Sequence, residues 1–94
     1  MSQRLRRHAD LRLTALAGEG VVLHLGSRRY FTVNEVGLTI LDALKTPRTF
    51  EELVAAVLDE FDVDPATAEE TTRAFLKQCQ DAAVVIEDSE RAGG

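Results

Sequence analysis

Few side chains in this 94-residue sequence have the type and spacing that catalysis requires. Its two histidines are His8 and His24, and its single cysteine is Cys79. His24 falls in the middle of a predicted strand with no nucleophile near it, so no serine, histidine and acid arrangement is indicated. We expect His24 to be an exposed or half-buried strand residue. Cys79 lies on the apolar stripe of a predicted helix, where burial suppresses thiolate reactivity, and we expect it in the core.

The acidic side chains predict neither a metal site nor a phosphate site. Asp62 and Asp64 are close in sequence, but their loop lacks the number of oxygen ligands that calcium takes. Gly18 and Gly20 precede a predicted strand rather than a helix, which is the wrong context for a phosphate-binding loop. The other carboxylates are expected on solvated helix faces and caps: Glu51, Glu52, Asp59, Glu60, Glu69 and Glu70. We therefore predict no catalytic residue, no cofactor and no metal, which disfavours an enzyme acting alone.

Length and charge restrict the remaining classes. A chain of 94 residues is sufficient for one small domain, and the single cysteine excludes an internal disulfide and fits a reducing compartment. No signal peptide or membrane-spanning run is indicated, so the expected location is the cytoplasm. The net charge is -5, but residues 1–33 carry six arginines against two acids, whereas the rest is strongly acidic. The acidic part would repel nucleic acid.

The first third predicts an antiparallel meander of three strands. Residues 11–15 alternate apolar and polar side chains, and Gly18 and Gly20 then mark a turn. Residues 21–25 form a second strand, with Val22 and His24 on one face. Gly26 and Ser27 indicate a hairpin turn, because two-residue turns require positive φ. A third strand follows at 28–33, with Arg29, Phe31 and Val33 on one face and Tyr30 and Thr32 on the other.

Three helices are predicted after the strands. Asn34 is a helix N-cap before apolar residues at helical spacing, ending near Pro47. Thr49 with Glu52 forms a capping box that opens a second helix. Asp64 and Pro65 open a third helix, with an acceptor at the cap and proline in the first turn. Two apolar faces are expected: Leu53, Val54, Val57, Leu58 and Phe61 on the second helix, and Ala68, Thr72, Phe75, Leu76 and Cys79 on the third.

The fold class expected is therefore α+β: a three-stranded antiparallel sheet followed by a three-helix bundle, resembling a winged helix-turn-helix. Residues 84–86 are left open as a short strand or a hydrophobic tail. A single domain is expected over residues 1–94, with a core at about 6–86 and both termini frayed.

Two kinds of binding are compatible with this fold. A winged-helix DNA-binding regulator needs a basic recognition helix, but the predicted third helix carries Glu69, Glu70 and Asp81 against Arg73 and Lys77. The exposed edge of the sheet offers the other kind, because an extended peptide can add itself to an edge as a further strand. A covered edge, or a structural or regulatory partner domain, also remains open.

Several segments together resemble the PqqD-like family, also called RiPP recognition elements. The segment at 28–37, RRYFTVNEVG, has an aromatic pair followed by Asn-Glu-x-Gly between a strand and a helix. The segment at 41–65, LDALKTPRTFEELVAAVLDEFDVDP, and GEGVVLHL at 18–25 continue the similarity, as does the opening RRHADLRL at 6–13. The resemblance covers about residues 6–86.

The resemblance implies a peptide chaperone that binds the leader of a ribosomally synthesised precursor peptide and presents it to a modifying enzyme in natural-product biosynthesis. The implied enzyme is a radical SAM protein, a leader peptidase or a similar protein. In this family the leader pairs with the third strand and lies against the third helix. The implied leader-binding residues are Arg28, Arg29, Tyr30, Phe31, Thr32 and Val33 on the strand side and Thr71, Phe75, Gln78 and Ala82 on the helix.

Two departures and one charge pattern qualify this interpretation. Cys79 stands where relatives commonly have leucine, and Ala83 where a glycine commonly follows, so the end of the third helix is expected to differ. Arg28 and Arg29 predict acidic residues in the leader. No nucleic acid and no membrane are expected as partners. A homodimer through an exposed strand edge stays open, and neither the precursor nor the product class follows from the sequence.

Overall fold

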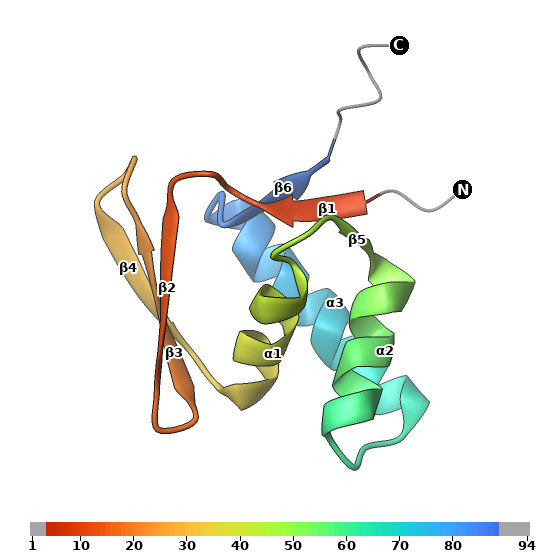
Figure 1. Ribbon diagram of the computed structural model, residues 1–94. Helices are drawn as coiled ribbons and strands as arrows, with labels where there is room; N and C mark the ends of the chain where they lie inside the picture. Colours follow the sequence, from red (N-terminus) through yellow and green to blue (C-terminus); the bar gives the residue numbers. More distant parts are fainter. Residues whose placement is uncertain (1–3, 89–94) are drawn as a thin grey trace, which may run out of the picture.

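The structure is a computed structural model that describes residues 4–88. Figure 1 shows an upright antiparallel sheet on one side of three helices, with short strands crossing above the helices. The elements run along the chain as β1 (Arg4–Arg7), β2 (Leu11–Leu16), β3 (Glu19–His24), β4 (Arg29–Val33), α1 (Glu35–Ala43), β5 (Arg48–Thr49), α2 (Phe50–Glu60), α3 (Pro65–Asp81) and β6 (Val85–Glu87).

The upright sheet confirms the predicted meander and, with the three helices, the α+β class. Its strand order is β2-β3-β4, and both pairs are antiparallel. The β2–β3 turn consists of Ala17 and Gly18, with φ of 49° and 84°. Two consecutive residues with positive φ are typical of the type I′ turn, whose twist matches that of the flanking strands.

The second turn differs from the predicted two-residue form. His24 and Arg29 are the last paired residues, so residues 25–28 join β3 to β4. The Arg28 N–H donates to the His24 carbonyl at 2.8 Å, and Arg28, not Gly26, has the positive φ, at 60°. The hairpin predicted at Gly26 and Ser27 is confirmed, but its turn has four residues rather than two, and the left-handed position falls on the last of them.

The expectation that His24 is exposed or half-buried is also wrong. His24 is only 6% exposed, and its ring lies against that of His8, with centroids 4.6 Å apart. The Ser27 N–H donates to His24 Nδ1 at 3.3 Å. The alternation of β3 is as predicted, but Val22 and His24 face the helices, whereas Leu23 on the opposite face is 37% exposed.

Local side-chain bonds begin the first two helices where predicted. The Gly37 N–H donates to Asn34 Oδ1 at 2.9 Å. The capping box is complete, because the Glu52 N–H donates to Thr49 Oγ1 and the Thr49 N–H donates to Glu52 Oε1, at 3.2 and 2.9 Å. Each such bond satisfies a backbone amide that the helix leaves free.

The third helix begins at Pro65, but Asp64 does not act as the predicted side-chain cap. Asp64 stands at the N-cap position without a side-chain cap hydrogen bond, and the strongest bond of its carboxylate is to the Thr67 hydroxyl, which donates at 2.6 Å. That hydrogen bond holds the pKa of Asp64 below its ordinary value, because it stabilises the ionised carboxylate.

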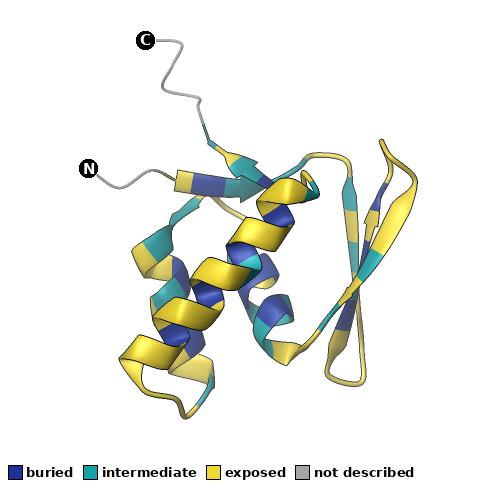
Figure 2. Ribbon diagram, turned by 180° about the vertical axis from the view of Figure 1, so that it is seen from behind, coloured by how far each residue is buried: buried dark blue, intermediate teal, exposed yellow. Residues whose placement is uncertain are grey.

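The core lies where the three helices meet the inner face of the sheet. Figure 2 shows buried positions along the inner sides of the helices and exposed positions on their outer sides. Ile40 and Leu53 are fully buried, and burying a side chain of this size contributes about 1.5–3 kcal/mol. Most predicted inner positions of α3 are buried: Ala68, Thr72, Leu76 and Cys79, with Phe75 half-buried.

A second small sheet was not predicted. Its order is β5-β1-β6, and β1 pairs antiparallel with both neighbours. Leu5 of β1 faces the core, and an ion pair between Arg6 and Asp88, at 3.6 Å, joins the two ends of the described chain. Residues 84–86, left open between strand and tail, include the first part of β6. The termini predicted to be frayed, outside about residues 6–86, include residues 4, 5 and 87, which lie in β1 and β6. Residues 1–3 and 89–94 lie outside the described residues.

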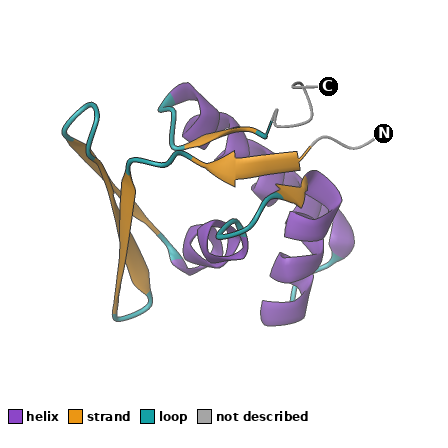
Figure 3. Ribbon diagram, turned by 45° about the horizontal axis from the view of Figure 1, so that its top comes forward, coloured by secondary structure: helices purple, strands orange, loops and turns teal. Residues whose placement is uncertain are grey.

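The meander leaves two open edges. Within the described chain, β2 and β4 each pair only with β3, as Figure 3 shows from above. Neither contains proline. Within residues 4–88, none of the helices is long and apolar enough to cross a bilayer.

Candidate peptide-binding groove

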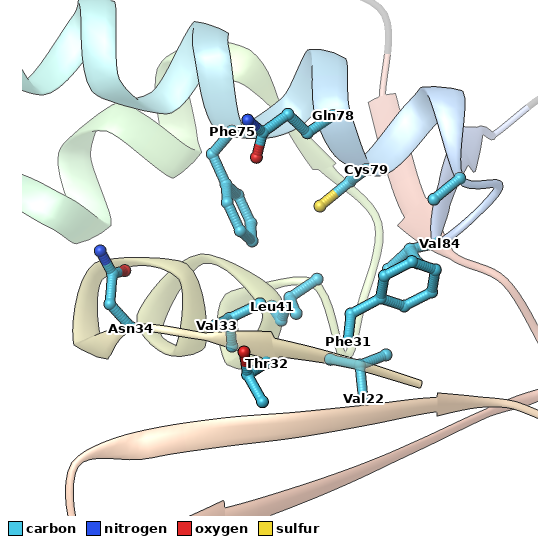
Figure 4. A pocket seen from close by; sticks show the side chains of 11 residues that line it. Val22, Phe31, Thr32, Val33, Asn34, Leu41, Phe75, Gln78, Cys79 and Val84 are labelled. Carbon is cyan, nitrogen blue, oxygen red and sulfur yellow. The ribbon is translucent and has the colours of Figure 1, made fainter. Parts of the chain in front are cut away.

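A groove separates the open β4 edge from α3. Its volume is about 250 Å³. Figure 4 shows the Phe75 ring pointing from α3 toward the strand, with Phe31 on the facing side. The lining residues come from β3, β4, α1, α3 and the segment before β6: Val22, Phe31, Thr32, Val33, Asn34, Leu41, Phe75, Gln78, Cys79, Ala82 and Val84.

The strand wall follows from the alternation of β4. Phe31 and Val33 are half-buried toward the helices, while Tyr30 on the opposite face is 72% exposed. Val22 pairs with Phe31 across the sheet and is 1% exposed, so it extends this apolar wall into the floor. Because successive strand residues point to opposite faces, Phe31 and Val33 present their side chains to the groove, and Thr32, which also borders it, is exposed at the strand edge.

The helix wall follows from the period of α3. Phe75, Gln78, Cys79 and Ala82 recur at spacings of three and four residues, which places them on one face of the helix. Gln78 is exposed at the rim, whereas Cys79 is 6% exposed. The wall is therefore apolar at depth and carries an amide at its rim.

Gly37 fixes the position of the Phe75 ring. A β-carbon at position 37 would lie 2.7 Å from Phe75 Cε1 and 3.1 Å from Val33 Cβ. Both distances are too short for an ordinary contact, so only glycine allows α1 to approach the ring this closely. Asn34, which caps the same helix, lies at the neighbouring rim of the groove. The first turn of α1 thus supports the groove at the junction of strand and helix.

A Schellman motif ends α3 beside the groove. The Val84 N–H donates to the Cys79 carbonyl at 2.8 Å, and the Ala83 N–H donates to the Gln80 carbonyl at 3.1 Å. Ala83 has φ of 60°, the left-handed conformation that this motif requires. Val84 is thereby turned back into the core as part of the groove lining. The departure from glycine at position 83 leaves the motif intact.

The groove has the chemistry of a binding surface. Cys79 is its one thiol, and burial raises the pKa of that thiol from 9.0 to about 12, so the nucleophilic thiolate is scarce near neutral pH. Within the described part of the chain, no three histidine, cysteine or acidic side chains are placed to hold a metal ion. Apolar walls with a few polar rim groups suit an apolar side chain attached to a hydrogen-bonding backbone.

The groove brings together six of the ten residues predicted for peptide binding. These are Phe31, Thr32, Val33, Phe75, Gln78 and Ala82. Thr71 is exposed on α3 and does not line the groove, so its role in leader binding stays a prediction. Tyr30 points to the other face of the sheet. Five lining residues were not predicted as site residues: Val22, Asn34, Leu41, Cys79 and Val84.

Arg28 and Arg29 lie just beyond one end of the groove. Both are exposed, and Arg29 shares the strand parity of Phe31 and Val33. No ion pair holds either guanidinium within residues 4–88. This end of the β4 edge is therefore positively charged and free to meet an anion.

The fold and the groove define a small winged-helix-like α+β domain whose sheet edge faces a helix across an apolar cleft. The sequence model of the family described as Coenzyme PQQ synthesis protein D (PqqD) matches residues 19–85. The chain therefore belongs to the PqqD family. No curated protein matches the chain.

Two solved structures share the fold. One is TbiB1 in complex with the TbiA(beta) leader peptide, which is 29% identical, has a TM-score of 0.76, and covers 85% of this chain and 93% of its own. The other is lasso peptide synthetase B1 complexed with the leader peptide, which is 16% identical with a TM-score of 0.68. The match with the second covers 87% of this chain and 96% of that one.

Proposed function

We propose that this protein binds the leader of a ribosomally synthesised precursor peptide by strand addition to β4. The observation that carries the proposal is the open β4 edge beside the apolar groove. Membership of the PqqD family supports it, as does the similarity to TbiB1, which was solved with a leader peptide. Backbone bonds to the edge supply affinity, and the groove selects side chains.

The groove specifies what the bound segment looks like. An extended peptide presents alternate side chains to one face, so every second residue of the leader meets Phe31, Val33 and Phe75. Those leader side chains are apolar, because the buried part of the groove offers no charged partner. Asn34 and Gln78 serve polar groups of the peptide at the rim. Acidic leader residues meet the two arginines beyond the end of the groove.

The protein acts as a chaperone in natural-product biosynthesis, and a separate enzyme modifies the precursor. That enzyme is a radical SAM protein, a leader peptidase or a similar partner. A DNA-binding role finds no support in the surface of α3. Its Arg73 is paired with Glu69 at 3.3 Å and also lies over the Phe50 ring at 5.2 Å, so this cation is already engaged.

Titration of a fluorescently labelled leader peptide, taken from a short precursor encoded nearby, tests the proposal. Phe75→Ala removes the helix wall and is expected to weaken binding by roughly tenfold or more, the usual effect of deleting an aromatic anchor. Phe50→Ala is the matched control, because Phe50 is also half-buried but lies outside the groove. Circular dichroism checks that both variants fold.

Saturable binding that Phe75→Ala loses and Phe50→Ala retains is the expected result. Equal losses in both variants would show that binding does not use the groove. No binding by any leader tested would contradict leader recognition itself.

A further inference from the structure

The second open edge, β2, has no role in leader binding as proposed. Its sequence, LRLTAL, contains one charged residue and no proline, and its last residue, Leu16, is 61% exposed. Natural proteins usually blunt such edges with lysine, proline, bulges or a covering segment, because a free edge pairs with other chains. Within the described residues β2 has none of these devices, apart from Arg12.

Two hollows flank this edge, and they carry opposite charges. The first, about 410 Å³, is bounded by Arg6, Arg7, His8 and Lys45. The second, about 420 Å³, is bounded by Asp42 and Glu60. Leu13 lines both hollows, so the sign of the charge changes at the middle of the strand.

The charge change can be traced to α1 and the residues that follow it. Asp42 and Lys45 are one helical turn apart, and the Lys45 N–H donates to the Asp42 carbonyl at 3.1 Å. Their side chains border different hollows. Arg6 is already paired with Asp88, and neither Lys45 nor Asp42 has an ion-pair partner within residues 4–88. Both are available to a partner.

We propose that β2 is a homodimer interface, in which two copies pair antiparallel about a two-fold axis at Leu13. An antiparallel pair reverses the direction of the second edge. The basic end of each copy therefore meets the acidic end of the other. Lys45 of each copy faces Asp42 of the other copy, so the dimer contains two such pairs. A two-fold interface uses the same patch on both subunits, which this charge pattern satisfies.

A two-fold axis at Leu13 also pairs side chains of matching polarity across the interface. Leu13 meets its own counterpart, Leu11 meets Ala15, and Arg12 meets Thr14, so apolar side chains face apolar ones on the inner side. Because this dimer uses only the β2 edges, it leaves both β4 edges free for leader peptides.

Sedimentation over a concentration series, using the full chain at low salt, tests the proposal. The native protein is expected to reach twice its 10.3 kDa mass. Asp42→Lys places lysines face to face, and Lys45→Asp places aspartates face to face. Each single variant is expected to raise the dimer dissociation constant by roughly tenfold or more. The exposed changes Glu70→Lys and Lys77→Asp, away from β2, are matched controls that dimerise like the native chain.

The decisive step mixes the two single variants. In a mixed dimer the lysine introduced by Asp42→Lys in one copy faces the aspartate introduced by Lys45→Asp in the other. The second pair of the mixed dimer keeps its native lysine and aspartate. An equimolar mixture, and the double variant Asp42→Lys/Lys45→Asp, are both expected to recover the dimer. A native monomer at every concentration overturns the proposal, as does failure of the mixture to dimerise.

The test separates this interface from leader recognition. Addition of a leader peptide is expected to leave the dimer intact. A dimer that dissociates when the leader binds would place the interface on β4 and overturn the assignment to β2. Phe75→Ala, which removes a groove wall, is expected to leave dimerisation unchanged whether or not any leader binds.

Discussion

The three specified residues of the Asn-Glu-x-Gly segment, Asn34, Glu35 and Gly37, each make a different structural contact. Asn34 caps α1, and the carboxylate of Glu35 lies against the β2–β3 turn, where a β-carbon at Gly18 would be 3.0 Å from Glu35 Oε2. Gly37 makes room for the Phe75 ring. The cap was predictable, because it is a local pattern. The role of Gly37 was not, because it depends on a ring from a helix far along the chain.

Gly37→Ala is expected to weaken leader binding and to lower stability. The added methyl group forces the Phe75 ring away from α1 and into the groove, and overpacking of this kind typically costs about 1–3 kcal/mol. Urea denaturation and leader titration measure the two effects. Phe75→Leu, which replaces the ring with a shorter side chain, is expected to restore part of the stability lost in Gly37→Ala. If Gly37→Ala costs as much stability in the Phe75→Leu background as in the native chain, the ring is not the obstacle.

Cys79 offers a chemical probe of the groove floor. Its thiol pKa of about 12 leaves about one thiolate in ten thousand at pH 8, so a disulfide reagent is expected to react slowly with the folded chain and quickly in denaturant. Because the folded-state pKa is raised above the ordinary 9.0, the contribution of this group to stability is present below pH 9 and falls as the pH rises toward 12. Bound leader is expected to slow labelling further. Labelling at equal rates in folded and unfolded protein would contradict this.

At the scale of elements, the predictable parts are those encoded by local signals. Caps at Asn34 and Thr49 and the proline of α3 mark three helices, and alternation marks the strands of the meander. The sheet β5-β1-β6 escaped prediction because β1 consists of RLRR and β5 only of RT, without alternating apolar residues. The pairing of β1 with β6 joins opposite ends of the chain, as in Leu5 with Glu87, and is set by tertiary contacts.

The inward face of β3 also could not be deduced from alternation. The set containing Val21, Leu23 and Leu25 is more apolar than the set containing Val22 and His24, yet the second set is the buried one. His24 tolerates burial because the Ser27 N–H, in the turn that follows β3, donates a hydrogen bond to its ring, and because the His8 ring packs against it. Alternation fixes which residues share a face, but the position of the helices decides which face is covered.

The left-handed conformation of Ala83, just after α3, can be tested by substitution. Ala83→Gly is expected to stabilise the protein by up to about 1 kcal/mol. The left-handed conformation costs an alanine roughly 1–2 kcal/mol, and glycine avoids this cost. Part of the gain is lost because glycine has a greater conformational entropy in the unfolded state. Ala74→Gly, exposed within the same helix, is the control and is expected to lose about 1 kcal/mol. Urea midpoints compare the two. Destabilisation by both glycines would show that position 83 is not strained.

At the scale of the whole molecule, the charge division along the sequence becomes a division in space. Arg28 and Arg29 lie at one end of the β4 edge, whereas α2, α3 and the loop between them carry nine of the fifteen acidic residues in residues 4–88. The sequence alone could place the strand half of the groove, since alternation selects Phe31 and Val33. It could not place the floor residues Val22, Leu41 and Val84, which three separate segments bring together.

This arrangement predicts how leader binding depends on salt. Reversing Arg28 and Arg29 to glutamate is expected to weaken binding of an acidic leader by roughly tenfold or more at low salt, mainly through slower association. The difference from the native protein should shrink as salt rises, because exposed charges are screened over about 10 Å at 0.1 M ionic strength. Stopped-flow fluorescence at several salt concentrations measures the association rate. Reversal of Arg73 and Lys77, exposed on α3 outside the groove, is the matched control and should leave that rate nearly unchanged. If the affinity of the Arg28 and Arg29 variant at low salt equals that of the native chain, the leader is not recognised through its acidic residues, and the apolar groove alone must set its register.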